Sequence, residues 1–426
     1  SGLTSAGKTL ATAALQTWTD IIGVNFVQVT SGGQIIFDDE DDGAYSDSNW
    51  SGEFITSSFV NVSSDWLADY GTDLNSYSFQ TYIHEIGHAL GLGHAGNYNG
   101  EASFPYDAEF YNDGWPVSVM SYFSPTDSSY YSGLGFTENY LMTPMLADII
   151  AMSTLYGLST NTRSGDSIYG IFATDPLFNP SLHSDAAWTI YDTGGTDTID
   201  YSSYYTHQTI NLNPETFSSV GTGVGNLTIA RGVVIENGKG GGGNDTLTGN
   251  GVDNVLEGGF GDDTTNGGGG NDTASYAGNY SAVTVNLGLA GAQNTVGAGL
   301  DTLVSIENLR GSDHADHLTG NSGNNLLSGG GGDDVMNGGD GDDSFRAGLG
   351  LTQDVMDGGS GIDHVLYDDA LAGITVNLSA GTAASTVGDY AAIGSDQLSN
   401  IENVTGSNFS DILTGNGSAN ILNGLG

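Results

Sequence analysis

The chain has 426 residues, 51 acidic side chains against 6 basic ones, a net charge of -45 and no cysteine. Its length allows more than one domain with a buried core. Such a surface would repel nucleic acid and anionic membranes, and the lack of cysteine excludes disulfides and a thiol nucleophile. It would attract cations, although solubility or adaptation to a salty medium is an alternative explanation for part of the acidic excess.

The first part of the chain, up to about Leu158, mixes helical and strand patterns. Leu10, Ala14, Trp18 and Ile21 recur at helical spacing and predict an amphipathic helix. Asn25 to Val29 and Gln34 to Phe37 are then expected to form short strands, separated by Ser31-Gly32-Gly33. No segment is long and apolar enough to span a membrane, since the most apolar run, 142–152, is short and contains Asp148.

Residues 84–94, HEIGHALGLGH, carry the strongest chemical signal. On a helix His84 and His88 lie on one face, and Gly91 can end the helix so that His94 returns as a third ligand. Three imidazoles leave the fourth tetrahedral position of a zinc ion open, as a catalytic site needs. Glu85 cannot join this ligand set, but it suits a general base acting on a metal-bound water.

The alternative is a chance pattern of two surface histidines and a solvated glutamate. The third histidine at a fixed offset argues against it. Phe79, Ile83, Ile86 and Leu90 also give the helix an apolar face that would pack into a core, with the histidines on the other side.

Downstream, Met120 and Tyr122 stand in the sequence Ser-Val-Met-Ser-Tyr. With the zinc motif, this segment resembles the Met-turn of the metzincin metalloproteases and, more narrowly, that of the serralysins. The resemblance implies that Met120 forms a hydrophobic floor under the histidines and that Tyr122 alternates between the zinc and the transition state. Ordinary core packing of both residues is the alternative. One departure is Ala95, where serralysins usually have a proline after the third histidine.

A later helix is expected from Thr143, as N-cap, to Gly157, with Pro144 at its first position. Met145, Ile149, Met152 and Tyr156 would form its buried side. The segment resembles the helix that closes a serralysin catalytic domain.

Beyond Arg163 the sequence becomes rich in glycine, asparagine and aspartate, and six segments fit GGxGxD. This is the nonapeptide repeat of calcium-binding parallel β-rolls, in which turns supply carbonyl and carboxylate ligands. The candidate calcium residues in these turns are Gly240, Gly242, Asp245, Gly258, Asp263, Gly267, Asp272, Asp316, Gly329, Gly331, Asp334, Gly338, Asp343 and Asp363.

Turns eighteen residues apart should stack, because one repeat is half a coil. Asp245 with Asp263, and Asp316 with Asp334, can therefore share an ion. In two weaker pairs, Asn254 with Asp272 and Asn325 with Asp343, an amide replaces one carboxylate. The insertion between Arg346 and Asp357 should stop or shift this ladder before Asp363.

Composition alone would favour a disordered linker. The nine-residue period argues instead for a packed roll, as does an aliphatic residue near many of the aspartates, namely Leu247, Leu318, Leu366 and Leu413. Without calcium, repulsion between stacked carboxylates should leave this half largely unfolded.

The join between the two halves also resembles the serralysins. Arg163, Gly165, Ser167, Asp192, Gly194 and Asp197 match one calcium site of that family, and Gly195, Asp197, Val234 and Glu236 match a neighbouring one. A tight turn without an ion is the alternative.

A longer repeat, in which Thr-Ile/Val-Asn-Leu precedes an Ile-Glu-Asn step, occurs three times. We therefore expect a catalytic domain over 1–162 and three β-roll modules over 163–278, 279–368 and 369–426. The chain stops at Gly426 within a repeat and starts at Ser1 without a signal sequence, so we expect a processed or truncated product of a longer precursor.

The predicted fold class is an α+β metzincin catalytic domain followed by an all-β parallel roll. The resemblance implies a secreted bacterial zinc endopeptidase with one catalytic zinc ion and several structural calcium ions. We expect it to be a monomer that acts on protein or peptide substrates, without nucleic acid or membrane insertion. The alternative is a calcium-dependent adhesin or surface-layer protein with an inactive protease-like head, which the repeated modules favour and the intact Glu85 and Tyr122 oppose.

Overall fold

The computed structural model describes residues 2–348, 350, 352–385 and 393–426. The chain divides into two compact units: Ser1–Asp200 with Leu212–Ile235, and Tyr201–Asn211 with Glu236–Gly426. The predicted boundary at 162/163 lies inside unit 1, and those at 278/279 and 368/369 lie inside unit 2. The division into one catalytic domain and three modules stays a prediction.

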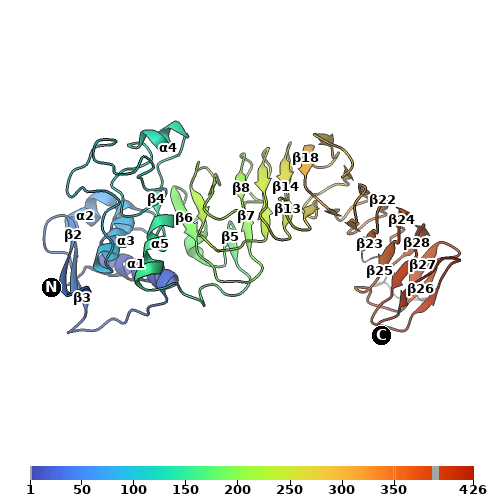
Figure 1. Ribbon diagram of the computed structural model, residues 1–426, viewed down its shortest axis with the longest axis horizontal. Coiled ribbons are helices and arrows are strands. Elements are labelled where there is room, and N and C mark those ends of the chain that lie inside the picture. Colours follow the sequence, from blue (N-terminus) through green and yellow to red (C-terminus); the bar gives the residue numbers. More distant parts are fainter. Residues whose placement is uncertain (1, 349, 351, 386–392) are drawn as a thin grey trace. The chain divides into compact units, whose positions relative to one another are not determined.

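Unit 1 contains the helices (Figure 1). They are α1 (Ser5–Ile22), α2 (Ser64–Tyr70), α3 (Tyr77–Ala89), α4 (Ser129–Gly133), α5 (Leu146–Leu155) and the 3-10 helix η1 (Pro176–Phe178). The predicted stripe of α1 is confirmed, because Leu10, Ala14, Trp18 and Ile21 are all buried. Helix α3 packs against α1 on one side and against β2 and β3 on the other. Helix α3, which carries His84 and His88, is thereby held within the core of unit 1.

The sheets of unit 1 are small. The first has the order β1-β3-β2, with β1 parallel and β2 antiparallel to β3, and a second has the order β4-β6-β10-β9. The strands are β1 (Ile35–Asp38), β2 (Ala44–Ser51), β3 (Phe54–Val62), β4 (Tyr140–Leu141), β5 (Ile168–Gly170), β6 (Ala186–Ile190), β7 (Thr198–Asp200), β9 (Phe217–Ser218) and β10 (Leu227–Ile229).

Two expectations for unit 1 are wrong. Asn25 to Val29 do not form a strand: Val27 is 80% exposed, and none of the five side chains is buried. Helix α5 begins at Leu146 rather than at Pro144, because the Asp148 carboxylate caps it by accepting the N–H of Met145 at 2.8 Å.

The predicted buried side of α5 holds for three of its four residues. Met145, Ile149 and Met152 are buried, whereas Tyr156 is 45% exposed and donates its hydroxyl hydrogen to the carbonyl of Leu90. Among the described residues, no helix has both the length and the apolar character needed to cross a membrane.

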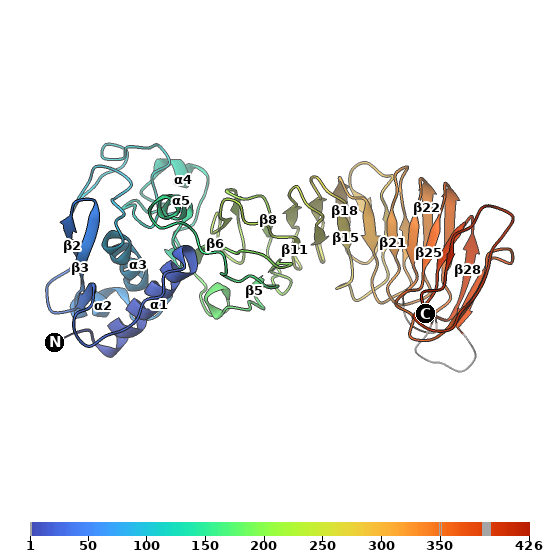
Figure 2. The same ribbon diagram turned by 60° about the horizontal axis from the view of Figure 1, so that its bottom comes forward.

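Unit 2 is a stack of short, mostly parallel strands joined by glycine-rich turns (Figure 2). One sheet has the order β11-β13-β15-β19-β21-β23-β25-β29-β31, and two others have the orders β8-β12-β14-β18-β17 and β16-β20-β22-β24-β28-β27-β26-β30. The strands are β8 (Thr209–Asn211), β11 (Asn237–Lys239), β12 (Thr246–Thr248), β13 (Val255–Glu257), β14 (Thr264–Asn266), β15 (Thr273–Ser275), β16 (Thr284–Asn286), β17 (Gln293–Asn294), β18 (Leu300–Val304), β19 (Asn308–Arg310), β20 (His317–Thr319), β21 (Leu326–Ser328), β22 (Val335–Asp340), β23 (Ser344–Arg346), β24 (Val355–Ser360), β25 (His364–Leu366), β26 (Ile374–Asn377), β27 (Thr382–Ser385), β28 (Ser395–Ser399), β29 (Asn403–Thr405), β30 (Ile412–Thr414) and β31 (Leu422–Asn423).

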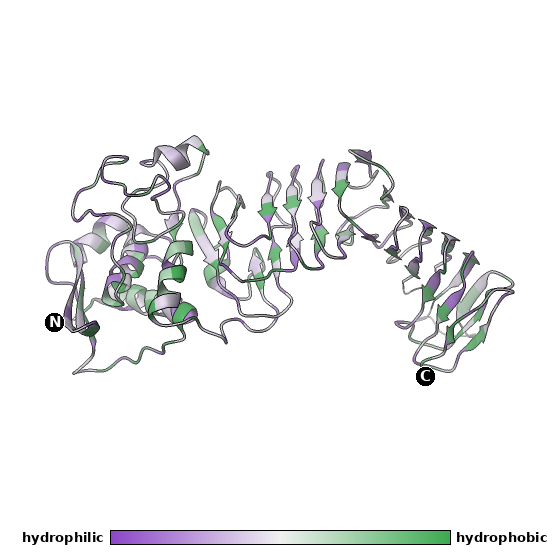
Figure 3. Ribbon diagram, in the orientation of Figure 1, coloured by the Kyte–Doolittle hydropathy of each residue, from purple (hydrophilic) through white to green (hydrophobic). Residues whose placement is uncertain are grey.

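One inward side chain from most of the short strands fills the roll, although the buried residue of β11 is Gly238 and both residues of β31 are exposed. In Figure 3 many strands of the roll carry the hydrophobic colour over part of their length, while the turns between them are mostly hydrophilic or neutral. Leu247 and Leu318 are buried as expected, but beside Asp363 the inward residue is Val365 and not Leu366. The fold class is therefore confirmed as an α+β region followed by a parallel β-roll.

The predicted stacking is also seen in the strand register. Thr246 pairs with Thr264 and His317 with Val335, eighteen positions apart. After the insertion the spacing becomes twenty, as in the pair Val335 and Val355. The ladder thus shifts at the insertion and does not stop.

Candidate metal centres

The chain folds locally so that three histidines converge. The Ser76 hydroxyl caps α3 by accepting the N–H of Phe79 at 3.3 Å, and the helix ends at Ala89. Gly91 has a φ of +105°, a conformation that an L side chain rarely adopts. The chain reverses there and brings His94 back toward the helix.

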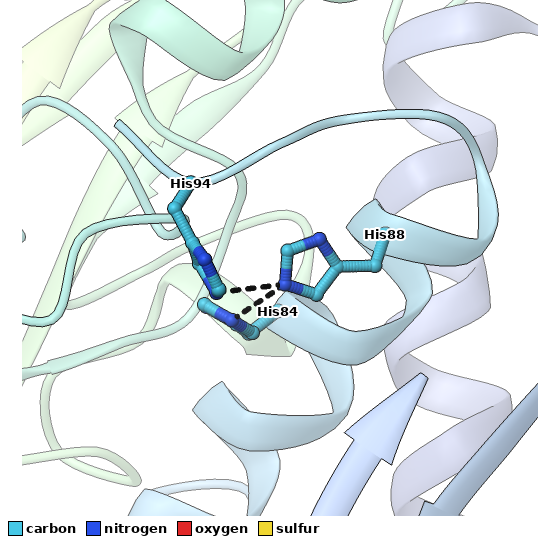
Figure 4. A group of neighbouring side chains, drawn as sticks. All are labelled: His84, His88 and His94. Carbon is cyan, nitrogen blue, oxygen red and sulfur yellow. Dashed lines mark hydrogen bonds between the residues drawn. The ribbon is translucent and has the colours of Figure 1, made fainter. Parts of the chain in front are cut away.

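The Nε2 atoms of the three histidines face one another (Figure 4). His88 Nε2 lies 3.1 Å from His84 Nε2 and 3.0 Å from His94 Nε2. In the described part of the chain this is the one group of at least three histidine or acidic side chains whose ligand atoms all lie within 4.8 Å of one another.

A backbone carbonyl fixes the orientation of each imidazole ring. The Nδ1 atoms of His84, His88 and His94 lie 2.8 Å from the carbonyl oxygens of Val119, Leu92 and Tyr98, respectively. A carbonyl can only accept, so each Nδ1 carries the proton and each Nε2 presents a lone pair.

Three lone pairs that converge in this way repel one another unless a cation lies between them. Burial, with repulsion from His88 as the next cause, lowers the pKa of His84 to about 3 and that of His94 to about 4. The rings are therefore neutral at physiological pH, which is the form that ligates zinc. The donor set fits a zinc ion with one open position.

The side chain of Glu85 is buried at the same end of α3. Its residue is 7% exposed, and burial raises the pKa of its carboxyl to about 8. A carboxyl whose pKa lies near physiological pH can both take up and release a proton there.

Tyr122 and Met120, the other two predicted site residues, lie beside the histidine cluster. The Tyr122 ring is 4.5 Å from that of His94 and 5.9 Å from that of His84, centroid to centroid. Met120 is buried, and a Cβ added to Gly87 would lie 2.7 Å from Met120 Sδ. Gly87 in α3 therefore lets the methionine pack directly beneath the histidines.

Asp148 is a supporting residue that sequence reasoning missed. Its buried carboxylate accepts hydrogen bonds from the Ser118 hydroxyl at 2.7 Å and from the Val119 N–H at 2.8 Å, in addition to capping α5. Since the carbonyl of Val119 in turn orients His84, the carboxylate supports this predicted zinc ligand through one peptide unit. The apolar surroundings of Asp148 in the sequence gave no signal of this contact.

Tyr98 is a second residue beside the histidines that sequence reasoning missed. Ala95, which stands where serralysins usually have a proline, makes a backbone hydrogen bond in the same loop. The ring of Tyr98 stacks on that of His94 at 5.5 Å, and its hydroxyl donates to the Asp113 carboxylate at 3.1 Å. The N–H of Ala95, which a proline would lack, donates to the carbonyl of Met120 at 3.4 Å.

The stacked aspartates of unit 2 form a ladder between coils. The N–H of Asp245 donates to Asp263 Oδ1 at 2.7 Å, and the N–H of Asp316 donates to Asp334 Oδ1 at 2.8 Å. The same contact joins Asn254 to Asp272 and Asn325 to Asp343, and after the insertion it joins Asp343 to Asp363, each at 2.8 Å.

The second carboxylate oxygen of several ladder residues is buried without a hydrogen-bond partner. These atoms are the Oδ2 of Asp263, Asp272, Asp334, Asp343 and Asp363. Burial raises the pKa of Asp263 to about 7, and burial raises that of Asp334 to about 8. An unpaired buried oxygen is costly, so these turns fit a hard cation such as calcium.

In the ladder, Asp245 and Asp316 stand in a different environment. Asp245 Oδ2 accepts the N–H of Gly241 at 2.6 Å, and Asp316 Oδ2 accepts that of Ser312 at 2.5 Å. The structure also brings the turn glycines beside the carboxylates: a Cβ on Gly240, Gly258, Gly267, Gly329 or Gly338 would lie 2.1 to 2.4 Å from an aspartate Oδ2. Gly242 and Gly331 lie in the same turns.

The predicted residues of the join in unit 1 also come together. The Asp197 carboxylate accepts the N–H of Ser167 at 2.8 Å, and Asp192 accepts that of Gly194 at 2.9 Å. A Cβ on Gly195 would lie 2.5 Å from the carbonyl carbon of Gly165, so these two loops touch.

The other predicted residues of the join are Arg163, Val234 and Glu236. The Arg163 guanidinium pairs with Asp20 at 2.6 Å and with Asp175 at 2.9 Å, which leaves only its backbone carbonyl for a cation. Val234 belongs to unit 1 and Glu236 to unit 2, so the neighbouring site stays a prediction.

Comparisons with known proteins agree with these features. The description "Peptidase M10 serralysin C terminal" matches residues 158–267, "RTX calcium-binding nonapeptide repeat" matches 310–345 and 399–426, and "Peptidase M66" matches 69–130. The metallopeptidase AprA of Pseudomonas marginalis is 39% identical over 257 residues, which are 57% of this chain and 54% of the relative. Serralysin C of Dickeya chrysanthemi is 41% identical over 256 residues, 56% of this chain and 52% of the relative. The chain spans about half the length of the curated relatives it matches.

Proposed function

Because the chain is serralysin-like and carries RTX calcium-binding repeats, we propose that it is a secreted zinc-dependent endopeptidase that hydrolyses peptide bonds of extracellular proteins. The convergence of three neutral imidazoles beside a buried glutamate carries this proposal. The chain would act as a monomer, with protein or peptide substrates as its partners.

His84, His88 and His94 would hold the ion, and their carbonyl partners keep the three Nε2 lone pairs aimed at it. Bound zinc would supply a water of lowered pKa and would polarise the scissile carbonyl. Glu85 takes a proton from the attacking water and passes it to the leaving amine. The Tyr122 hydroxyl donates a hydrogen bond to the carbonyl oxygen as negative charge develops there. Met120 keeps the ligands in place from below.

Calcium ions would bind the glycine-rich turns of unit 2 and the join in unit 1, where they neutralise buried carboxylates. The net charge of -45 makes this neutralisation a condition for folding, since only six basic side chains are available. Export followed by folding in a calcium-rich exterior fits this dependence.

Casein hydrolysis by the full chain in millimolar calcium tests the proposal. Glu85→Ala should lower the rate by a factor of about 10² to 10⁴, the usual contribution of a general base. Glu109→Gln, a change at an exposed carboxylate of the same unit, should leave the rate unchanged.

Two outcomes would contradict the proposal. Undiminished hydrolysis by the Glu85→Ala variant would refute the general-base role of Glu85. No hydrolysis by the intact chain would favour the adhesin or surface-layer alternative.

A further inference from the structure

The loop after the third histidine folds the side chain of Tyr98 back onto His94. The two rings lie 5.5 Å apart, centroid to centroid, with 27° between their planes. A Cβ on Gly96 would lie 2.5 Å from Tyr98 Cε1, so the glycine leaves the room that this ring needs. The carbonyl of Tyr98 also accepts the Nδ1 proton of His94 at 2.8 Å. The backbone and the side chain of one residue therefore hold the same imidazole.

Tyr98 borders Tyr122 as well. The centroids of these two rings are 4.9 Å apart. The backbone N–H of Gly100, two residues after Tyr98, hydrogen-bonds the Tyr122 hydroxyl. A phenol oxygen that accepts such a bond keeps its own hydrogen free to donate. The short segment from Tyr98 to Gly100 thus contacts both the third histidine and the tyrosine beside it.

The hydroxyl end of Tyr98 is fixed in the interior of unit 1. It lies 3.1 Å from Asp113 Oδ2 and 3.3 Å from Asp113 Oδ1, and Ser121 hydrogen-bonds both side chains. Tyr98 is 7% exposed and Asp113 is 2% exposed. Burial raises the pKa of Tyr98, so the hydroxyl keeps its proton and donates it to the carboxylate.

This buried pair is the loop's single anchor. Of residues 93–101, Tyr98 alone is buried, and its neighbours on both sides are exposed or half-buried. Withdrawing the Tyr98 hydroxyl would take a hydrogen bond from a buried carboxylate, and such bonds are stronger than those between neutral groups. The position of the Tyr98 ring is therefore set by the core of unit 1 and not by the exposed loop that carries it.

We propose that Tyr98, anchored by Asp113, is a positioning residue that holds His94 in place as a zinc ligand and keeps Tyr122 aligned for catalysis. This proposal rests on the proposed endopeptidase function. It assigns two separable effects to the ring: tighter zinc binding through His94 and faster turnover through Tyr122. Groups that orient a metal-ligating histidine typically contribute about 10- to 100-fold in metal affinity or activity.

Zinc affinity is the first readout, and it does not require hydrolysis. Competition with a chelator, on the full chain in millimolar calcium, should show that Tyr98→Leu raises the Kd for zinc about tenfold or more. Tyr98→Phe keeps the ring but loses the anchor, so its Kd should lie between those of the unaltered chain and Tyr98→Leu. Tyr131→Phe is the matched control. It removes a fully buried hydroxyl that donates to the carbonyl of Asn112 at 2.8 Å, and it should leave the Kd unchanged.

Turnover in saturating zinc is the second readout. Tyr98→Leu should lower kcat for a casein peptide about tenfold and change KM less than about twofold, because the Tyr122 hydroxyl acts as charge develops and not in binding. In a Tyr122→Phe background the same change should lower kcat by less than about threefold, since the hydroxyl that Tyr98 positions is gone. A purely structural role would lower kcat by the same factor in both backgrounds.

The proposal is overturned if Tyr98→Leu binds zinc as tightly as the unaltered chain, or if its loss of kcat is equal in the two backgrounds. If circular dichroism in calcium shows that Tyr98→Leu has not folded, Tyr98→Phe replaces it in both comparisons, where it should change each quantity by at least about twofold. Absence of hydrolysis by the unaltered chain would count against the proposed function instead, and the zinc titration would still decide the role of Tyr98 at His94.

Discussion

Gly87→Ala tests how tightly the floor of the histidine cluster is packed. The new Cβ would lie 2.7 Å from Met120 Sδ and 3.2 Å from Trp18 Cζ2, whereas ordinary contacts to a Cβ begin near 3.4 Å. The methionine sulfur would therefore have to move by about 0.7 Å to restore an ordinary contact. Overpacking of this kind costs about 1–3 kcal/mol, against a gain of up to about 1 kcal/mol from replacing glycine in a helix.

The displacement should also reach the zinc ligands, because the peptide before Met120 carries the carbonyl that orients His84. Misplacement by about 1 Å can cost about 10² in rate, so we expect kcat/KM for a casein peptide to fall by a factor of about 10 to 10².

Gly133→Ala is the control for helix propensity, since nothing lies within 4 Å of its added Cβ. Urea unfolding in calcium and peptide hydrolysis should be measured on both variants. The reasoning is refuted if Gly87→Ala is as stable and as active as Gly133→Ala.

Three further predictions concern Asp148, calcium and Ala95. Asp148→Ala leaves the Ser118 hydroxyl and the N–H groups of Val119 and Met145 without their acceptor. The free energy of unfolding, measured in urea, should therefore fall by about 3 kcal/mol or more. A fall below about 1 kcal/mol would contradict this prediction. In calcium-free buffer the raised pKa values of the ladder carboxyls mean that the folded state holds protons that the unfolded chain releases, so the folded fraction of unit 2, followed by circular dichroism, should fall as pH rises from about 4 toward 8, and millimolar calcium should restore it. A calcium-free folded fraction that rises with pH would be inconsistent with buried, unpaired carboxyls. Ala95→Pro removes one long hydrogen bond to the carbonyl of Met120, so the free energy of unfolding should fall by no more than about 1 kcal/mol and the zinc content should not change. Loss of zinc from this variant would show instead that the loop depends on the Ala95 N–H.

The sequence predicted those elements whose buried side chains recur at a regular spacing. The spacing of Leu10, Trp18 and Ile21 gave α1, and the histidine spacing gave the cluster at the end of α3, because both follow directly from helical geometry. The stacking of the rolls followed in the same way from the period of eighteen. The insertion predicted a break, but only the structure shows that the register resumes at twenty.

Backbone partners and long-range contacts could not be predicted in this way. The carbonyls of Val119, Leu92 and Tyr98 have no signature in residue identity, and Asp148 looked like an interruption of an apolar run. Asn25 to Val29 include Phe26, Val27 and Val29, which are residue types common in strands, yet no neighbouring strand pairs with them in the described part of unit 1. Tertiary context decided each of these cases.

Reactivation by zinc is the most direct test of the central claim. The full chain, kept in millimolar calcium, is stripped with a chelator selective for zinc and then titrated with zinc while peptide hydrolysis is followed. The three-histidine site predicts no hydrolysis in the stripped protein and full recovery at one equivalent of zinc per chain. Full activity in the stripped protein, or none at any zinc concentration, would contradict the assignment of this chain as a zinc endopeptidase.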